Sequence, residues 1–160
     1  MFAAENGLSG DPRLQGIYEA IRVVPNFPKP GIMFQDITSL VSNHRVFKDT
    51  IDILVDRYKN MGISVVAGVE ARGFIFAPAI ALEIGAKFIP LRKAGKLPER
   101  AGAEVVECAC IIGLPEVEGR NRLDGKPVYI LVEPRQQNYV VWYITLRSSL
   151  VLTFFICCNA

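Results

Sequence analysis

Cationic side chains follow two apolar segments in the middle of the chain, at the point where each segment ends. The segments are residues 65–69, VVAGV, and residues 87–91, KFIPL, and both have the short apolar pattern of a buried strand. The charged residues that follow them are Glu70, Arg72, Arg92, Lys93 and Lys96. Arginine and lysine grouped at one edge of a sheet bind anions. The sequence therefore predicts an anion site, and phosphate is the simplest ligand.

The segment between the two strands is predicted to be a helix. Residues 74–84 carry apolar side chains at helical spacing, and Gly85 occupies the position where a helix commonly ends in a left-handed glycine. A strand, a helix and a second strand form a βαβ unit, in which ligands bind beyond the carboxyl ends of the strands. Taken alone, residues 70–73 fit an ordinary turn and residues 92–96 a solvated basic turn. Together, on neighbouring strand ends, they favour a phosphate clamp.

Three segments resemble adenine phosphoribosyltransferases, and the plant enzymes in particular. They are residues 23–38, VVPNFPKPGIMFQDIT, residues 68–76, GVEARGFIF, and residues 90–98, PLRKAGKLP. The order and spacing of the three make the resemblance specific, and it extends over about residues 11–133. It implies an α/β fold of the type I phosphoribosyltransferase kind, with a parallel sheet flanked by helices. It also implies transfer of phosphoribose from phosphoribosyl pyrophosphate to adenine, Mg²⁺ bound with that substrate, and a homodimer.

The resemblance assigns base binding to a segment with three prolines, at positions 25, 28 and 30, and to the residues after it. The prolines exclude regular structure and form either a hood over the base, as in the family, or a stiff connector. By resemblance the backbone of Met33 and Gln35 reads the adenine edge and Phe34 stacks on the ring; the alternative is a core strand with Phe34 buried. Asp36 either caps the following segment or holds the hood in place.

Pyrophosphate binding is assigned by resemblance to the two loops of the central unit. In the family the position of Glu70 and Ala71 has a non-proline cis peptide, and Arg72 donates to phosphate. Arg92 is expected to reach across the homodimer interface.

One part of the family pattern is absent after Pro98. The family continues with a lid, two further strands, and a motif of two adjacent acids followed by a glycine-rich turn and a helix. Here residues 99–112, ERAGAEVVECACII, resemble the end of that helix and the strand after it. The sequence therefore predicts an internal deletion that truncates the sheet and removes the groups that hold ribose and the 5′-phosphate. No catalytic residue is identified.

Other elements are predicted from periodicity. Helices are expected over residues 12–23 and 43–60, and a final strand over residues 128–132. Residues 1–10 are expected to be disordered, residues 11–133 to form the incomplete transferase domain, and residues 134–160 to be a hydrophobic tail unrelated to the family.

The tail contains a run at residues 139–158 that is long enough to span a bilayer, interrupted by Arg147 and a few hydroxyl side chains. We favour the alternative that it is read-through with no selected role. The net charge of +2 does not indicate nucleic acid as a partner, and no secretory signal is recognised at the N-terminus. With four cysteines in no zinc-binding pattern, the expected location is cytoplasmic.

The sequence leaves three functional hypotheses. The first is an adenine phosphoribosyltransferase of purine salvage, which is the family identity. The second is a form without turnover that dimerises or binds adenine, and the missing motif favours it for this chain. The third is a fragment attached to a membrane through its tail.

Overall fold

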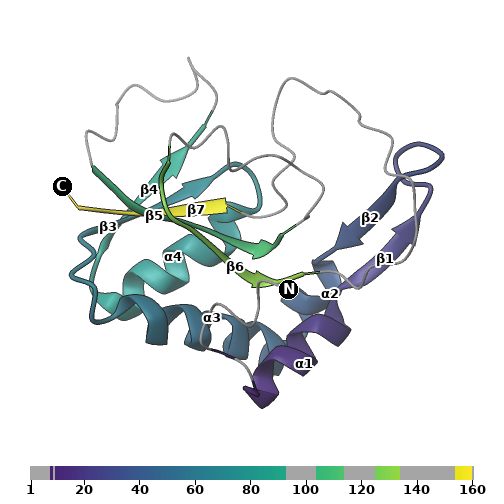
Figure 1. The fold of residues 1–160 in the computed structure, drawn as a ribbon, viewed down its shortest axis with the longest axis horizontal. Helices are drawn as coiled ribbons and strands as arrows, with labels where there is room; N and C mark the ends of the chain where they lie inside the picture. The colour runs from purple at the N-terminus through teal and green to yellow at the C-terminus, as the bar shows by residue number, and fades with distance from the viewer. Residues whose placement is uncertain (1–7, 9, 93–103, 114–124, 134–153, 160) are drawn as a thin grey trace.

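The computed structural model describes residues 8, 10–92, 104–113, 125–133 and 154–159, the last range for its backbone only (Figure 1). The helices are α1 (Pro12–Ala20), α2 (Thr38–Ser42), α3 (His44–Tyr58) and α4 (Gly73–Ile84). The strands are β1 (Arg22–Pro25), β2 (Met33–Asp36), β3 (Val65–Val69), β4 (Lys87–Leu91), β5 (Glu104–Ile112), β6 (Val128–Val132) and β7 (Phe154–Asn159).

Five strands form the main sheet in the order β4-β3-β7-β5-β6, and β1 and β2 form a separate antiparallel hairpin. β3 is parallel to β4, and β5 is parallel to β6. The predicted α/β fold with a parallel sheet is therefore observed. One feature differs from it: β7 lies between β3 and β5 and is antiparallel to both.

The central βαβ unit forms where its sequence pattern predicts it. β3 and β4 have the predicted bounds, and Gly85 follows α4 in the left-handed conformation, with φ of 74°. β3 and α4 approach each other closely at Gly68. A Cβ atom there would lie 2.8 Å from the carbonyl oxygen of Gly73. Glycine at position 68 thus allows the helix to begin directly against the strand.

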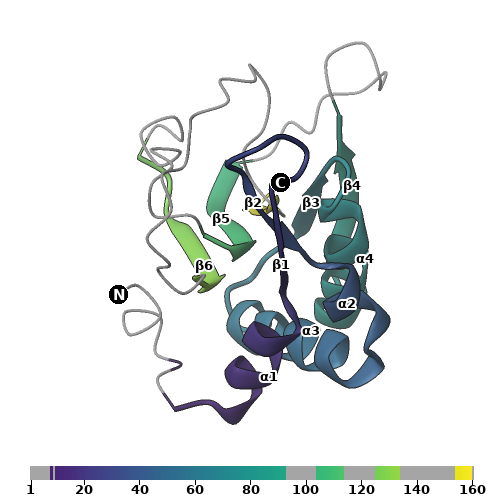
Figure 2. The ribbon, with the colours of Figure 1, turned by 90° about the vertical axis from the view of Figure 1, so that its right-hand side faces the viewer.

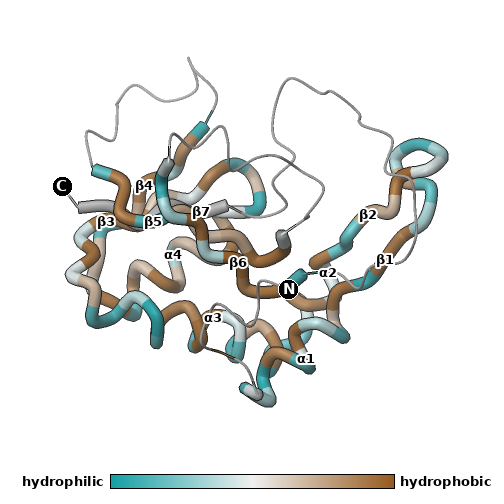
Figure 3. Tube along the Cα trace, viewed as in Figure 1, coloured by the Kyte–Doolittle hydropathy of each residue, from teal (hydrophilic) through white to brown (hydrophobic). Residues whose placement is uncertain are grey.

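Helices α1, α3 and α4 lie on one side of the main sheet, as the two perpendicular views show (Figure 1, Figure 2). Strands β3, β5 and β6 of this sheet are predominantly hydrophobic along their length (Figure 3). Strand residues and the inward faces of the helices form one core, whose largest fully buried side chains include Tyr58, Tyr129, Phe76, Ile17, Leu40 and Ile53. Burial of this apolar surface holds the helices on the sheet.

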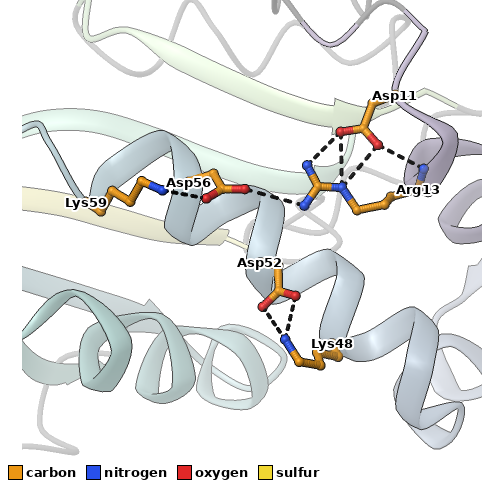
Figure 4. A network of polar contacts seen from close by, with 6 residues as sticks. All are labelled: Asp11, Arg13, Lys48, Asp52, Asp56 and Lys59. Atoms are coloured by element: carbon orange, nitrogen blue, oxygen red, sulfur yellow. Dashed lines mark hydrogen bonds and ion pairs between the residues drawn. The ribbon is translucent and has the colours of Figure 1, made fainter.

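A chain of polar contacts links α1 to α3 on the outside of the core (Figure 4). Asp11 caps α1 by accepting a hydrogen bond from the backbone N–H of Arg13, at 2.9 Å. The Arg13 guanidinium lies 3.4 Å from Asp56 on α3, which also accepts from Lys59 at 2.8 Å. Lys48 and Asp52 form a further pair along α3. Water screens exposed ion pairs, and ordering their long side chains costs entropy, so these contacts orient the helices more than they stabilise them.

A buried carboxylate joins α3 to the sheet. Glu107 on β5 is 6% exposed and accepts two hydrogen bonds from Arg57, at 2.6 and 2.7 Å, and one from the Tyr58 hydroxyl, at 2.7 Å. The Arg57 guanidinium also stacks on the Tyr129 ring, at 4.0 Å from its centroid. Burial raises the pKa of Tyr129 to about 12. These contacts satisfy a charge that would be costly to bury alone.

Three predicted boundaries need correction. The first helix ends at Ala20 and not near Val23, because Arg22–Pro25 forms β1. Pro25 is thus the last residue of a strand, and the proline-rich segment is not entirely irregular. A strand can include a proline where its N–H is not needed for pairing. The second predicted helix is shorter, beginning at His44 after Asn43 caps it, and the short α2 precedes it.

Candidate functional site

The β1–β2 hairpin stands beyond the ends toward which β5 and β6 run (Figure 1). Its register places Pro25 opposite Met33 and Val24 opposite Phe34. The loop at its tip contains Asn26, with a positive φ of 58°, whose side-chain carbonyl accepts from the N–H of Gly31 at 2.9 Å. The sequence therefore builds the proposed hood as an ordered hairpin with prolines in its loop.

The residues predicted to bind adenine lie together on β2. Met33 and Phe34 are partly buried, whereas Gln35 is 7% exposed. The Phe34 ring meets the Phe27 ring edge to face, with 5.0 Å between their centroids. A half-buried aromatic ring on an ordered strand is a suitable platform for a flat heterocycle.

Asp36 performs both of the roles between which the sequence could not choose. One carboxylate oxygen accepts from the backbone N–H and the hydroxyl of Thr38, at 2.9 and 2.7 Å, where α2 begins. The other oxygen accepts from Arg22 on β1, at 2.7 Å. The hydrogen bonds from Thr38, together with that from Arg22, lower the pKa of Asp36. One side chain thus anchors both strands of the hairpin to α2.

The loop from β3 to α4 has the conformation that the resemblance implies. The peptide bond between Glu70 and Ala71 is cis, as expected for the family position. The N–H of Glu70 donates to the carbonyl of Leu91 on β4, at 2.9 Å, and the carbonyl of Ala71 accepts from Phe74 in the first turn of α4. The loop is therefore tied to both the neighbouring strand and the helix, next to Arg72.

Arg72 connects this loop with the hairpin. Its guanidinium carbon lies 5.7 Å from the centroid of the Phe34 ring. At this distance a cation is attracted to the face of an aromatic ring. The two segments predicted to bind base and pyrophosphate are therefore neighbours in the fold, although Phe34 and Arg72 are 38 positions apart in the sequence.

Of the four cations predicted to converge, Arg72 and Arg92 lie within the described residues. Arg92 lies at the end of β4, and its Nε donates to Glu70 at 2.7 Å. The cationic edge thus includes a carboxylate that partly neutralises it. Lys93 and Lys96 lie outside the described residues. The sequence signalled neither the contact of Arg92 with Glu70 nor that of Arg72 with Phe34, because both join residues on different elements.

A pocket lies elsewhere on the molecule, among residues of α1, α3 and β6. Its volume is about 300 Å³. Its two arginines are already engaged, Arg13 with Asp11 and Arg57 with Glu107. It therefore offers an anion little uncompensated positive charge, and the loop edge around Arg72 remains the candidate site.

Two further findings concern only the residues that the structure describes. They contain no group of three or more histidine, cysteine or acidic side chains that could hold a metal ion. None of their helices is sufficiently long and apolar to cross a membrane. Residues 139–153 of the predicted hydrophobic run fall outside the described ranges, and the rest of that run belongs to β7.

The fold is that of a type I phosphoribosyltransferase. A structure of adenine phosphoribosyltransferase from Rhodothermus marinus superposes with a TM-score of 0.65 and 28% identity, over 76% of this chain and 98% of that one. The enzyme from Saccharomyces cerevisiae, complexed with an imino-altritol bisphosphate and adenine, gives a TM-score of 0.63 and 25% identity, over 75% of this chain and 98% of that one.

Sequence comparison identifies the family. Adenine phosphoribosyltransferase 5 of Arabidopsis thaliana is 56% identical over 184 aligned positions, which include 84% of this chain and 96% of that protein. Adenine phosphoribosyltransferase 2 of the same plant is 52% identical over 186 positions, 85% of this chain and 97% of that protein. No protein-family model matches the chain. The chain belongs to the adenine phosphoribosyltransferase family, whose members are pentosyl transferases.

The same alignments show the deletion. Since 84% of 160 residues is about 134, an alignment of 184 positions leaves about 50 positions of the Arabidopsis protein without a counterpart in this chain. The second relative gives the same number, about 50. The unmatched 16% of this chain is close in number to the residues after Glu133, where the sequence predicts the resemblance to stop.

Proposed function

We propose that this chain binds adenine through the β1–β2 hairpin and the pyrophosphate group of phosphoribosyl pyrophosphate through the loop after β3, without forming AMP on its own. The observation that carries the proposal is the proximity of Arg72 to the Phe34 ring, 5.7 Å from guanidinium carbon to centroid. This proximity places the proposed base platform beside a side chain that can bind phosphate.

The adenine part of the proposal rests on the backbone of β2. The edge of adenine carries donors and acceptors that main-chain N–H and C=O groups can match, and backbone groups hold their positions regardless of side chain. Met33 and Gln35 supply these groups, and Phe34 supplies the stacking face. The yeast relative was solved with adenine bound, which supports the choice of base.

The pyrophosphate part rests on Arg72 and Arg92, with Lys93 and Lys96 as further cations of the same edge by resemblance. Arg72 precedes the first turn of α4, where the helix dipole also favours an anion. Glu70 and Ala71 shape the loop through its cis peptide.

Lack of turnover follows from the deletion. Formation of AMP requires ribose, its 5′-phosphate and the leaving group to be held in one geometry while positive charge develops on the sugar. The residues of the family that hold the ribose phosphate belong to the motif that this sequence lacks. Loss of positioning alone removes roughly 7 to 11 kcal/mol of barrier reduction, or about five or more decades in rate.

Two measurements test these statements separately. Calorimetry with adenine and with guanine is expected to show heat for adenine only, and equal heats would remove the base site. Incubation with adenine, phosphoribosyl pyrophosphate and Mg²⁺ is expected to yield no labelled AMP above a host-enzyme blank. Turnover within tenfold of an intact family member would instead favour the second candidate, a working transferase, which the 56% identity supports.

We also propose that Mg²⁺ enters with phosphoribosyl pyrophosphate and not on a resident site. The described residues offer no cluster of acidic, histidine or cysteine ligands. When bound, the ion would neutralise charge on the leaving pyrophosphate. Equal affinity for pyrophosphate with Mg²⁺ and with EDTA would argue against this coupling.

A homodimer is supported by an apolar surface on α4 and the adjoining edge strand. Ile75 and Leu82, two turns apart on α4, are 40% and 81% exposed, and Phe88 on β4 is 37% exposed. Several large apolar side chains exposed to solvent commonly mark a surface that another protein surface covers. We expect sedimentation to show a dimer that Leu82→Glu dissociates, with Glu83→Lys on the same helix as the control.

We further propose a cytoplasmic location. Cys108 and Cys110 lie in β5 as buried thiols, which suits a reducing compartment. A fluorescent fusion of the full chain that follows organelle or membrane markers would contradict this.

A further inference from the structure

The C-terminal strand occupies the centre of the main sheet, where it separates the two parallel pairs (Figure 1, yellow). On one side it pairs with β3, from Val65 opposite Cys158 to Gly68 opposite Phe155. On the other side it pairs with β5, from Glu104 opposite Asn159 to Cys110 opposite Phe154, with a register shift between Val105 and Glu107. Both ladders are antiparallel.

The strands on either side of β7 are the most deeply buried of the sheet. Val65, Val66 and Ala67 on β3 are at most 1% exposed, and residues 108–112 on β5 are at most 4% exposed. With β7 in place, these residues are almost completely shielded from water. Without a strand in this position, two buried edges would be left unpaired, which native proteins avoid.

The deletion falls in the connection between the two parallel pairs of strands that β7 separates. About 50 aligned positions of the Arabidopsis relative have no counterpart here, and the sequence places their loss between Pro98 and β5, which is the connection from the β4 side of the sheet to the β5 side. In the sequence the deletion therefore falls between β4 and β5, and in the sheet β7 lies between the β3–β4 pair and the β5–β6 pair.

We propose that residues 154–159 are an internal replacement strand: they fill the groove between β3 and β5 that the deletion opens, and by doing so keep the chain folded. The groove accepts this segment of the same chain. The inference assigns a structural role to a hydrophobic tail that otherwise fits a membrane span or read-through, and it does not depend on the proposed function.

The direction of β7 determines what the tail can replace. Its first residues lie at the carboxyl ends of β3 and β5, and its last residues lie at the opposite edge of the sheet. Asn159, the last residue of β7, therefore lies on the side away from the Arg72 loop. A strand that ran in parallel would deliver a turn and a helix N-terminus to the site. The antiparallel strand restores backbone pairing but cannot restore that turn.

A disulfide in the full chain tests the location of β7. Directly opposed residues of antiparallel strands have Cα atoms about 4.5–5.5 Å apart, within the range that a disulfide spans. Val66→Cys is therefore expected to oxidise to a disulfide with Cys157, found by mass spectrometry of peptides from the monomer. The matched controls are Val66→Cys with Cys157→Ser, and Ile63→Cys, which precedes the strand. A disulfide that forms only between two copies, or equally from position 63, would overturn the assignment.

A proline in the strand tests its role in folding. Ile156 pairs with Ala67 and with Cys108, so Ile156→Pro removes an N–H from a central strand. We expect its melting temperature to fall by about 10 °C or more, or the protein to aggregate. Gln136→Pro, two positions after Pro134 in the tail, is the control and is expected to melt within about 2 °C of the parent.

Equal melting temperatures for the two proline variants would refute the replacement role. So would flotation of the parent chain with phosphatidylcholine vesicles, because a tail inserted in lipid cannot also pair with β3 and β5. Rapid hydrogen exchange at residues 65–68 and 104–110 in the parent chain would likewise count against it, since β7 pairing is expected to protect those amides.

Discussion

The Nε atom of Arg92 lies 2.7 Å from a carboxylate oxygen of Glu70, so the ends of β3 and β4 are joined by an ion pair at the edge where the anion is expected. Glu70 is itself part of the loop that ends in Arg72. The carboxylate therefore holds Arg92 in place and at the same time competes with any phosphate for it.

Replacing Glu70 tests which of these effects dominates. We expect Glu70→Gln to bind pyrophosphate about 2- to 5-fold more tightly, since it removes a negative charge worth about 0.5–1 kcal/mol at a partly exposed site. Calorimetric titration with pyrophosphate at two salt concentrations measures this, and the gain should shrink at high salt. Glu83→Gln, on the exposed side of α4, is the control. Weaker binding by Glu70→Gln would show that positioning of Arg92 outweighs competition.

Phe34 is expected to supply most of the stacking energy for adenine. Loss of an aromatic ring from a base platform costs about 1–3 kcal/mol, so Phe34→Ala should weaken adenine binding by roughly 5- to 150-fold. Met61→Ala removes an apolar side chain that is 40% exposed at the end of α3, and it should leave adenine affinity unchanged. If the two variants bind adenine equally, the platform lies elsewhere.

Asp36 is expected to make the stability of the hairpin depend on pH. Its pKa is lowered below 3.8 in the folded protein, so its contribution is complete above pH 3.8 and is lost as the pH falls through the lowered value. Asp36→Asn should reduce the free energy of unfolding at pH 7 by about 1–2 kcal/mol. The difference from the parent should disappear in acid.

Urea denaturation at several pH values between about 7 and 2.5 measures this difference across the titration of Asp36. Glu19→Gln, on the exposed face of α1, serves as the control and should track the parent throughout. A constant difference between Asp36→Asn and the parent would mean that hydrogen-bond geometry, and not charge, is responsible.

Two glycine substitutions are expected to act in opposite directions. Gly68→Ala would place Cβ 2.8 Å from the backbone oxygen of Gly73, which cannot rotate away, so the strand and α4 must separate. We expect a loss of about 1–3 kcal/mol, as for other overpacked core sites. Gly16→Ala meets nothing within 4 Å in α1 and should gain about 0.5–1 kcal/mol. Thermal unfolding of both variants measures the contrast.

Local sequence pattern was sufficient to predict the central βαβ unit and to identify the family. The apolar run at residues 65–69, the helical spacing after Gly73 and the glycine at position 85 each depend on near neighbours in sequence, and all three elements form where predicted. The three motifs identified the family, and the cis peptide at Glu70 followed from that identification. The roles of Met33, Phe34, Gln35 and the cationic residues remain predictions from the resemblance.

Contacts between distant segments were decided only by the tertiary structure. The composition of the apolar run before Cys158 fits both a membrane span and a central strand. Which of the two forms depends on whether other strands leave backbone groups unpaired, as β3 and β5 would without β7. The same holds for Arg57 with Glu107, which are 50 residues apart. Periodicity shows which face of an element is apolar, but the partner of that face depends on how the whole chain packs.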